Sequence, residues 1–329
     1  LGDANILTYV REQEVFGWTH YSTRGSFKSV AAVREDDDDV MYAVIERKVG
    51  GRTVQFIEAQ TTHDLTNVQD AVRVDASLSL DSPITITGYT NASTIVVTAT
   101  SHGLLNGDVV DLTLIKVVDD TVTRGWSYDT DLEGSGYTVA NKTTHTFELQ
   151  NEAVNVNSSA FSVYHSGGEV RKALTVLSGL WHMEGETLTG LANGYVVTGL
   201  VVANGSVTLP HPASRVHLGW GYTADIETLR LATPNQQDSV TGRHKKSSRL
   251  HLDLENTMGL WTGPNRDNMR EAKFGLPALW GQPVELITGM IDLTTSPSWN
   301  KEGRVVIQQR DPLPMTILSI TPDFIVGGN

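Results

Sequence analysis

The stretch REQEVFGWTHYSTRGSFKSVAAVREDDDDVMYAVIERKVGGRTVQFIE, residues 11–58, decides the fold class. Val40 to Glu46 alternates two sets of side chains, and Thr53 to Ile57 does the same over a shorter run. Between them lies Gly50-Gly51, which predicts a tight two-residue hairpin because the primed turns of such hairpins need positive φ. Another apolar run, Ser29 to Val33, precedes an acidic corner. The period is two throughout, so we predict an antiparallel β-meander.

Two short segments of this stretch, Phe16-Gly17-Trp18-Thr19 and Ile45-Glu46-Arg47, carry a family resemblance. With the residues around them they resemble a segment of the tail tube or nozzle subunits of short-tailed bacteriophages, also called stabilisation or tail tubular B proteins. Family members are longer and have a β-propeller before this segment. We therefore expect residues 1–80 to form a terminal propeller blade or the sheet next to one. The chain starts at Leu1 without a Met, which favours a fragment or a processed subunit.

The resemblance also implies a location and a set of partners. It implies a structural protein of the virion tail that assembles in the host cytoplasm. Copies of the chain would form a ring, a hexamer by family likeness, through which genomic DNA leaves the particle. Further partners would be the tail adaptor ring and the tail fibre or spike proteins.

Length and composition set broad limits on the kind of protein. A chain of 329 residues predicts two or three domains. Cysteine is absent, which excludes disulfides, thiolate metal sites and cysteine nucleophiles. No apolar run approaches the roughly 20 residues that a membrane-spanning helix needs. We therefore expect no membrane-spanning segment.

The formal net charge is −13, and the negative charge is spread over all parts of the chain. An acidic chain is poorly suited to gripping nucleic acid, because neutralisation of phosphates supplies most non-specific affinity. It can still surround DNA, since a negative wall repels the duplex and keeps it moving. We expect DNA to pass through the ring without sequence-specific binding.

Residues 81–169 are predicted to form an inserted small β-barrel. Their strand-like runs, such as Thr94 to Ala99 and Thr146 to Leu149, are rich in β-branched residues, and Asn106-Gly107 supplies a turn. The order of these motifs is similar to the module named after the first catalytic-cysteine half-domain of ubiquitin-activating enzymes, which recurs in phage tail proteins. Without a cysteine no thioester can form, so the resemblance implies a scaffold here and no ubiquitin chemistry.

Residues 170–329 are predicted to form a C-terminal β-sandwich or barrel with long loops. Asn193-Gly194 and Asn204-Gly205 are typical of hairpin turns about ten residues apart. Arg249 to Leu254 alternates cleanly, whereas Leu260 to Pro283 is rich in Gly, Pro and Trp and indicates a long structured loop. No amphipathic helix is evident anywhere. The predicted fold class is therefore all-β: meander, inserted barrel and C-terminal sandwich or barrel.

One basic cluster stands out in this acidic chain. Its cationic residues are Arg243, Lys245, Lys246 and Arg249. We interpret it as a contact with DNA or with an acidic neighbouring subunit, and the alternative is a solvated loop. Its position just before a clean strand favours a loop tip.

Two of the seven tryptophans are candidates for an exposed subunit interface, because Trp is enriched at binding hot spots. Trp220 lies between Gly219 and Gly221, and Trp261 precedes Thr262-Gly263-Pro264. Both contexts are rich in turn residues. We expect most of the other tryptophans to be core anchors.

Other clusters favour neither a metal site nor catalysis. Asp36 to Asp39 could offer oxygen ligands to calcium, but it lacks the spaced ligands of a binding loop and is better interpreted as a solvated corner. The pairs His211 with His217 and His244 with His251 lack the spacing of a zinc protease. Neither a serine-hydrolase elbow nor a phosphate-binding loop is present. We predict no metal, no cofactor and no enzymatic activity.

Three functions are weighed on this basis. The first is a subunit of a bacteriophage tail tube or nozzle ring that forms the conduit for DNA ejection. The second is a tail module that binds a host glycan or receptor, through the 81–169 barrel or the Trp-rich loops. The third is an enzyme that degrades the cell envelope, and the lack of a catalytic motif places it last.

Overall fold

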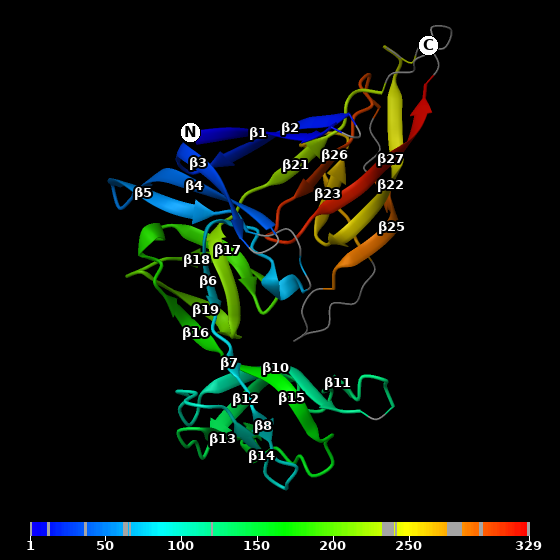
Figure 1. Cartoon of the computed structure of the whole chain (residues 1–329). Coiled ribbons are helices and arrows are strands. Elements are labelled where there is room, and N and C mark those ends of the chain that lie inside the picture. Colours follow the sequence, from blue (N-terminus) through cyan, green and yellow to red (C-terminus); the bar gives the residue numbers. More distant parts are fainter. Residues whose placement is uncertain are drawn as a thin grey trace. The chain divides into compact units, whose positions relative to one another are not determined.

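A computed structural model describes residues 2–11, 14–35, 38–61, 65, 67–119, 121–231, 240, 242–274, 285–295 and 299–327. Their regular structure is almost entirely β-strand, with short 3₁₀ turns at Val68–Asp70 and Trp181–Met183. The predicted all-β class is confirmed (Figure 1). Across these residues, no helix has the length and apolar character needed to cross a membrane.

The chain divides into two compact units. Unit 1 comprises Leu1–Leu78, Leu180–Gly205 and Leu218–Asn329, and unit 2 comprises Ser79–Gly179 and Ser206–His217. Unit 2 therefore contains the whole of 81–169 and adds residues 79–80, 170–179 and 206–217. Strands β6 (Asp75–Asp81) and β20 (Arg215–Trp220) each run across a unit boundary.

Unit 1 begins with a two-stranded hairpin followed by a three-stranded meander. The hairpin consists of β1 (Gly2–Val10) and β2 (Val15–Thr23), and the meander of β3 (Ser26–Glu35), β4 (Asp38–Val49) and β5 (Arg52–Ala59). Val49 pairs with Arg52, and Gly50 and Gly51 have φ of 55° and 78°. The tight glycine hairpin predicted from the sequence is thus confirmed.

The rest of unit 1 contains two more sheets and part of a third. One orders β21 (Ala224–Glu227), β26 (Val306–Gln309), β23 (Leu260–Gly263) and β24 (Arg270–Glu271). Another orders β25 (Ile287–Thr294), β22 (Lys245–Thr257) and β27 (Thr316–Val326). The third orders β18 (Tyr195–Val201), β17 (Thr187–Ala192), β20 and β6. The inward residues Leu250, Leu252 and Leu254 of β22 form a core with Leu260 and Ile307.

Unit 2 is built around a nine-stranded antiparallel sheet. Its main path is β7 (Ile84–Thr85), β15 (Tyr164–Lys172), β10 (Val109–Val118), β12 (Gly134–Ala140), β13 (Thr146–Asn151), β9 (Val96–Thr98) and β8 (Gly88–Tyr89). Two short strands lie off this path, β11 (Trp126–Tyr128) beside β10 and β14 (Val154–Asn155) beside β13. A separate pair is β16 (Leu174–Ser178) with β19 (Ser206–Ala213). The sheet encloses an apolar core that includes Ile115, Phe147 and Leu149.

The structure confirms one of the predicted Asn-Gly hairpins and differs from the prediction at the other one and in the predicted long loop. Asn193-Gly194 does connect β17 to β18, with Ala192 opposite Tyr195. Asn204-Gly205 is a turn but not a hairpin, because β19 pairs with β16 and the carbonyl of Gly205 accepts a bond from the amide of Leu180. The predicted loop Leu260 to Pro283 contains β23 and β24, and its residues 275–284 lie outside the described part.

Candidate functional site

The β1–β2 hairpin presents one strongly apolar face. Leu7 pairs with Trp18 and Tyr9 with Phe16, and directly opposed residues of an antiparallel pair lie on the same face. Their exposed fractions are 47% for Leu7, 69% for Trp18, 62% for Tyr9 and 68% for Phe16. Four large apolar side chains therefore form one continuous solvent-facing patch.

The size of this patch is unusual for a surface that faces only water. An aromatic side chain buries about 150–250 Å², so three rings that are two-thirds exposed offer roughly 300–500 Å². Patches of about 300–600 Å² are the largest on typical monomers and are often functional. The hairpin face alone is therefore roughly half of the ~800 Å² that one partner contributes to a standard interface.

The edges of the hairpin add hydrogen-bonding capacity to the apolar face. Among the described residues, β1 and β2 pair only with each other as a two-stranded sheet. Within the described part of the chain, their outer edges therefore carry N–H and C=O groups that no other strand pairs, and such groups form a template for another strand. Face and edges together are the features of a protein-contact surface.

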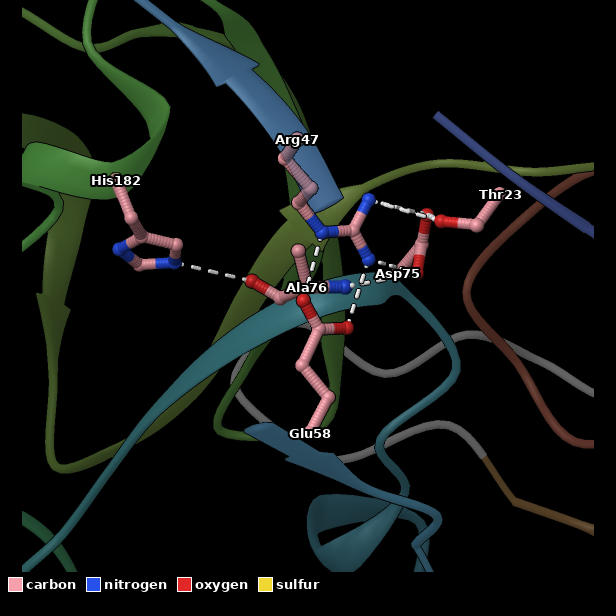
Figure 2. A network of polar contacts seen from close by, with 6 residues as sticks. All are labelled: Thr23, Arg47, Glu58, Asp75, Ala76 and His182. Atoms are coloured by element: carbon pink, nitrogen blue, oxygen red, sulfur yellow. Dashed lines mark hydrogen bonds and ion pairs between the residues drawn. The ribbon is translucent and has the colours of Figure 1, made fainter. Parts of the chain in front are cut away.

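The base of the hairpin is fixed by a buried arginine of the meander (Figure 2). Arg47 on β4 is fully buried, on the same face of the strand as Ala43 and Ile45. Its Nη1 donates to Oγ1 of Thr23, the last residue of β2, at 2.8 Å. The Thr23 hydroxyl in turn donates to Oδ2 of Asp75. The aromatic hairpin is thus attached to a rigid polar cluster.

Two carboxylates balance the buried guanidinium. Arg47 Nε and Nη2 donate to both oxygens of Glu58 on β5, at 2.6 and 2.7 Å. Nη2 and Nη1 also donate to the two oxygens of Asp75 on β6, at 3.0 and 3.4 Å. Burial by itself lowers the pKa of Arg47, but the hydrogen bonds and charges of Glu58 and Asp75 outweigh it and raise the pKa above its ordinary value. The arginine therefore stays charged.

The cluster extends through the residue after Asp75. Ala76 has φ of 52° and donates its amide to Oδ1 of Asp75 at 3.0 Å. Its carbonyl accepts a bond of 3.1 Å from Nε2 of His182. His182 belongs to the 3₁₀ turn Trp181–Met183, and Figure 2 shows its ring directed at the carbonyl of Ala76. Five separate segments of unit 1 meet at this point.

Trp220 belongs to the same cluster and is not an exposed interface residue. It is 3% exposed, with the guanidinium of Arg47 5.0 Å and that of Arg24 5.6 Å from its ring. The prediction of exposure is wrong because the flanking glycines do not mark a turn. Gly219 lies in β20, where an added Cβ would come within 2.4 Å of the carbonyl oxygen of Asp75. The glycine permits close backbone approach to β6 and thereby buries the ring.

Trp261, the other predicted interface residue, lies on β23 and is half-buried. The guanidinium of Arg310 lies 4.3 Å from its ring centroid. Arg310 is fixed there by two hydrogen bonds from its side chain to Oε1 of Gln308. The interface role of Trp261 stays a prediction, with a cationic side chain already covering part of the ring.

Three of the four residues of the basic cluster lie on a strand and not at a loop tip, and Arg243 lies just before that strand. Lys245, Lys246 and Arg249 belong to β22, which pairs with both β25 and β27. Lys245 is 1% exposed and donates from Nζ to the carbonyl of Lys301 at 2.8 Å, so it cannot reach DNA or another subunit. Arg249 is exposed, and Arg243 donates from Nε to the carbonyl of Gly327. For Arg243, Lys246 and Arg249 the contact hypothesis stays a prediction.

The acidic corner and the histidine pairs show no metal-ligand geometry in the described part of the chain. Asp36 and Asp37 lie outside it, and Asp39 pairs with Arg34 across β3 and β4. His217 is buried and bonds to Ser79 through Nδ1 at 2.6 Å, whereas His211 and His244 are exposed.

His251 occupies a charged position on the outer face of β22. Its Nδ1 contacts Asp292 on β25 and its Nε2 lies 3.3 Å from Asp323 on β27, so one imidazolium bridges both neighbouring strands. Hydrogen bonds to Asp292 and then Asp323 raise the pKa of His251 above its ordinary value of 6.5. The outer face of β22 also carries Arg249 and Asp253.

The pH dependence of this bridge can be predicted. Because the pKa of His251 is raised in the folded state, its stabilising contribution is complete below pH 6.5 and disappears as pH rises through the folded pKa. We expect His251→Gln to lower the melting temperature at pH 6 and to match the parent protein at pH 9. Differential scanning calorimetry at both pH values checks this, and an equal deficit at both would contradict the ionic bridge.

Sequence reasoning missed two parts of the site. It did not identify β1 or the role of Arg47, although Arg47 follows Ala43 and Ile45 at the period of a strand and therefore falls on their buried face.

No protein-family model matches this chain, and a comparison with curated proteins finds no match.

Proposed function

We propose that the chain is a structural subunit that assembles with copies of itself into a ring of a bacteriophage tail tube or nozzle, the conduit for DNA ejection. The observation that carries the proposal is the anchored aromatic hairpin, a large apolar face with open strand edges on a rigid base. Apolar surface of this extent is favoured at interfaces between subunits.

Ring closure needs two different surfaces on each subunit, and unit 1 offers a second one. Val33 and Ile57 are exposed on the outer face of the meander, where Val33 of β3 lies opposite Val40 and Ile57 of β5 lies opposite Val44. This face is opposite to that of Arg47. We assign it as the surface that receives the aromatic hairpin of the next copy, which gives a head-to-tail contact that can close around an axis.

The family resemblance supports the same proposal through particular residues. Phe16 and Trp18, which lie in one of the two resembling segments, belong to the exposed hairpin face, and Arg47 in the other segment fixes the base of that hairpin. By the same resemblance the ring has six copies, contacts the adaptor ring and the fibres or spikes, and forms part of the virion tail. The net charge of −13 suits a wall that DNA passes without being held.

The proposal is tested on the purified full chain by native mass spectrometry and negative-stain microscopy. We expect closed rings of six copies at high protein concentration, because assembly buries the apolar hairpin of each copy against its neighbour. A chain that stays monomeric at every accessible concentration contradicts the proposal.

A gel-shift assay with duplex DNA at physiological salt should show no retained complex, since an acidic wall lacks the cations for phosphate neutralisation.

A further inference from the structure

The outer face of the β10–β11 ribbon in unit 2 carries aromatic and cationic side chains side by side. Ile115 and Val117 of β10 point into the core, so Lys116 and Val118 face outward. Lys116 pairs with Tyr128 and Val118 with Trp126 of β11, which places all four on one face. Figure 1 shows β11 beside β10 at one margin of the sheet.

Trp126 holds two positive charges in fixed positions. Nζ of Lys116 lies 4.3 Å and Cζ of Arg124 4.2 Å from its ring centroid. Arg124 is further fixed by donating Nε to the Trp126 carbonyl at 2.7 Å. Within the described residues, neither the ammonium of Lys116 nor the two Nη groups of Arg124 donate a hydrogen bond. These donors are thus positioned in advance but remain available, which lowers the entropic cost of binding an anion.

The surroundings make this pair of cations distinctive. Unit 2 carries six Lys or Arg and eleven Asp or Glu residues, hence a formal charge of −5. Two of its six cations converge on one tryptophan. Apolar contact surface adjoins them, because Tyr128 and Val118 are 48% and 41% exposed and Leu114, also exposed, precedes them on β10.

We propose that this platform, formed by Lys116, Val118, Arg124, Trp126 and Tyr128, binds an acidic oligosaccharide. A uronic or sialic acid unit combines a carboxylate, which suits the paired donors of Arg124 and Lys116, with apolar C–H faces, which suit the Tyr128 ring and Val118. Trp126 is a positioning residue that orients both cations. The site goes beyond ring formation and does not depend on it.

Charge density favours a saccharide over a nucleic acid. A single strand of nucleic acid brings a phosphate at every nucleotide to a unit whose formal charge is −5. Asp119 also lies next to the platform, where hydrogen bonds from Thr121 first and the charge of Arg124 last lower its pKa and keep it ionised. Two cations can neutralise one or two carboxylates but not a long polyphosphate.

The test uses the full chain in isothermal titration calorimetry with three probes: an oligogalacturonate, a neutral dextran oligosaccharide of the same length and a single-stranded DNA oligonucleotide. We expect binding of the oligogalacturonate alone. Lys116→Gln and Arg124→Gln should each weaken it about tenfold, because each removes one charge-assisted hydrogen-bond donor. Lys142→Gln, at an exposed lysine elsewhere in unit 2, should leave the affinity unchanged.

Other outcomes would overturn the assignment. Absence of oligogalacturonate binding, equal binding of dextran, or equal loss in the Lys142→Gln variant each contradicts a charged saccharide site at this face. Preferential binding of the DNA strand would assign the platform to nucleic acid instead. Circular dichroism of each variant confirms that the fold is retained. Because monomeric protein suffices, failure of this test is distinct from failure of ring assembly.

Discussion

Replacing Arg47 with methionine is expected to destabilise unit 1 by about 3–5 kcal/mol, because removal of one partner leaves buried charges without compensation. Glu58 and Asp75 would then lie close together without a cation, and Asp75 would keep only the hydrogen bonds from the Thr23 hydroxyl and the Ala76 amide among those described. Methionine has a similar volume, so little of the loss comes from a cavity. Urea denaturation followed by tryptophan fluorescence measures the effect, since Trp220 lies against the guanidinium.

Two controls separate the buried charge from a general effect of substitution in β4. Lys48→Met changes the exposed neighbour on the same strand and should stay within about 0.5 kcal/mol. The triple variant Arg47→Met with Glu58→Gln and Asp75→Asn removes the unpaired charges and should recover most of the lost stability. Equal effects of Arg47→Met and Lys48→Met would mean that the cluster does not hold the strands together.

The sequence predicted those parts of the fold that depend on neighbouring residues. The period of two in β4 and β5 and the Gly50-Gly51 turn are local signals, and the structure contains them with the expected pairing. Asn193-Gly194 succeeded for the same reason. In each case the residues that determine the conformation are also the residues that adopt it.

Predictions failed where a distant segment determines the environment. Trp220 is buried because β6, more than a hundred residues earlier, passes Gly219 at close range. Lys245 is buried because Asn300 and Lys301 pair with and cover it. A glycine that permits a turn and a glycine that permits close packing look alike in one sequence, and so do a solvated and a buried lysine.

The candidate site depends both on local sequence signals and on the position of segments that are distant in the sequence. Phe16 and Trp18 lie in a segment that the sequence singled out, but their exposure depends on the absence of a covering strand, which only the arrangement of the described residues reveals. Thr23 has no distinguishing local pattern, yet it connects the hairpin to Arg47. The stretch that determines the meander therefore supplies Phe16 and Trp18 of the contact face, whereas Leu7 and Tyr9 come from β1, and it supplies Thr23, Arg47 and Glu58 of the anchor.

The second large effect is expected when the hairpin face is made polar. Phe16→Ser combined with Trp18→Ser should abolish ring assembly while leaving the subunit folded, because both rings point to solvent in the isolated chain. Loss of two aromatic hot spots at about 2 kcal/mol each weakens the contact roughly 10³-fold. Sedimentation velocity at matched concentrations gives the distribution of monomers and rings.

Substitutions at two exposed leucines test whether ring assembly depends on the hairpin face itself or on exposed apolar surface in general. Leu7→Ser lies on the hairpin face, whereas Leu229→Ser changes a leucine that is more exposed but lies between β21 and β22. Only Leu7→Ser should shift the equilibrium toward monomer. If Leu229→Ser disrupts assembly equally, or if the double variant still forms rings, the hairpin is not the contact. Since Arg47→Met weakens the anchor and the hairpin variants do not, reduced assembly at unchanged urea stability identifies the aromatic face itself as the contact.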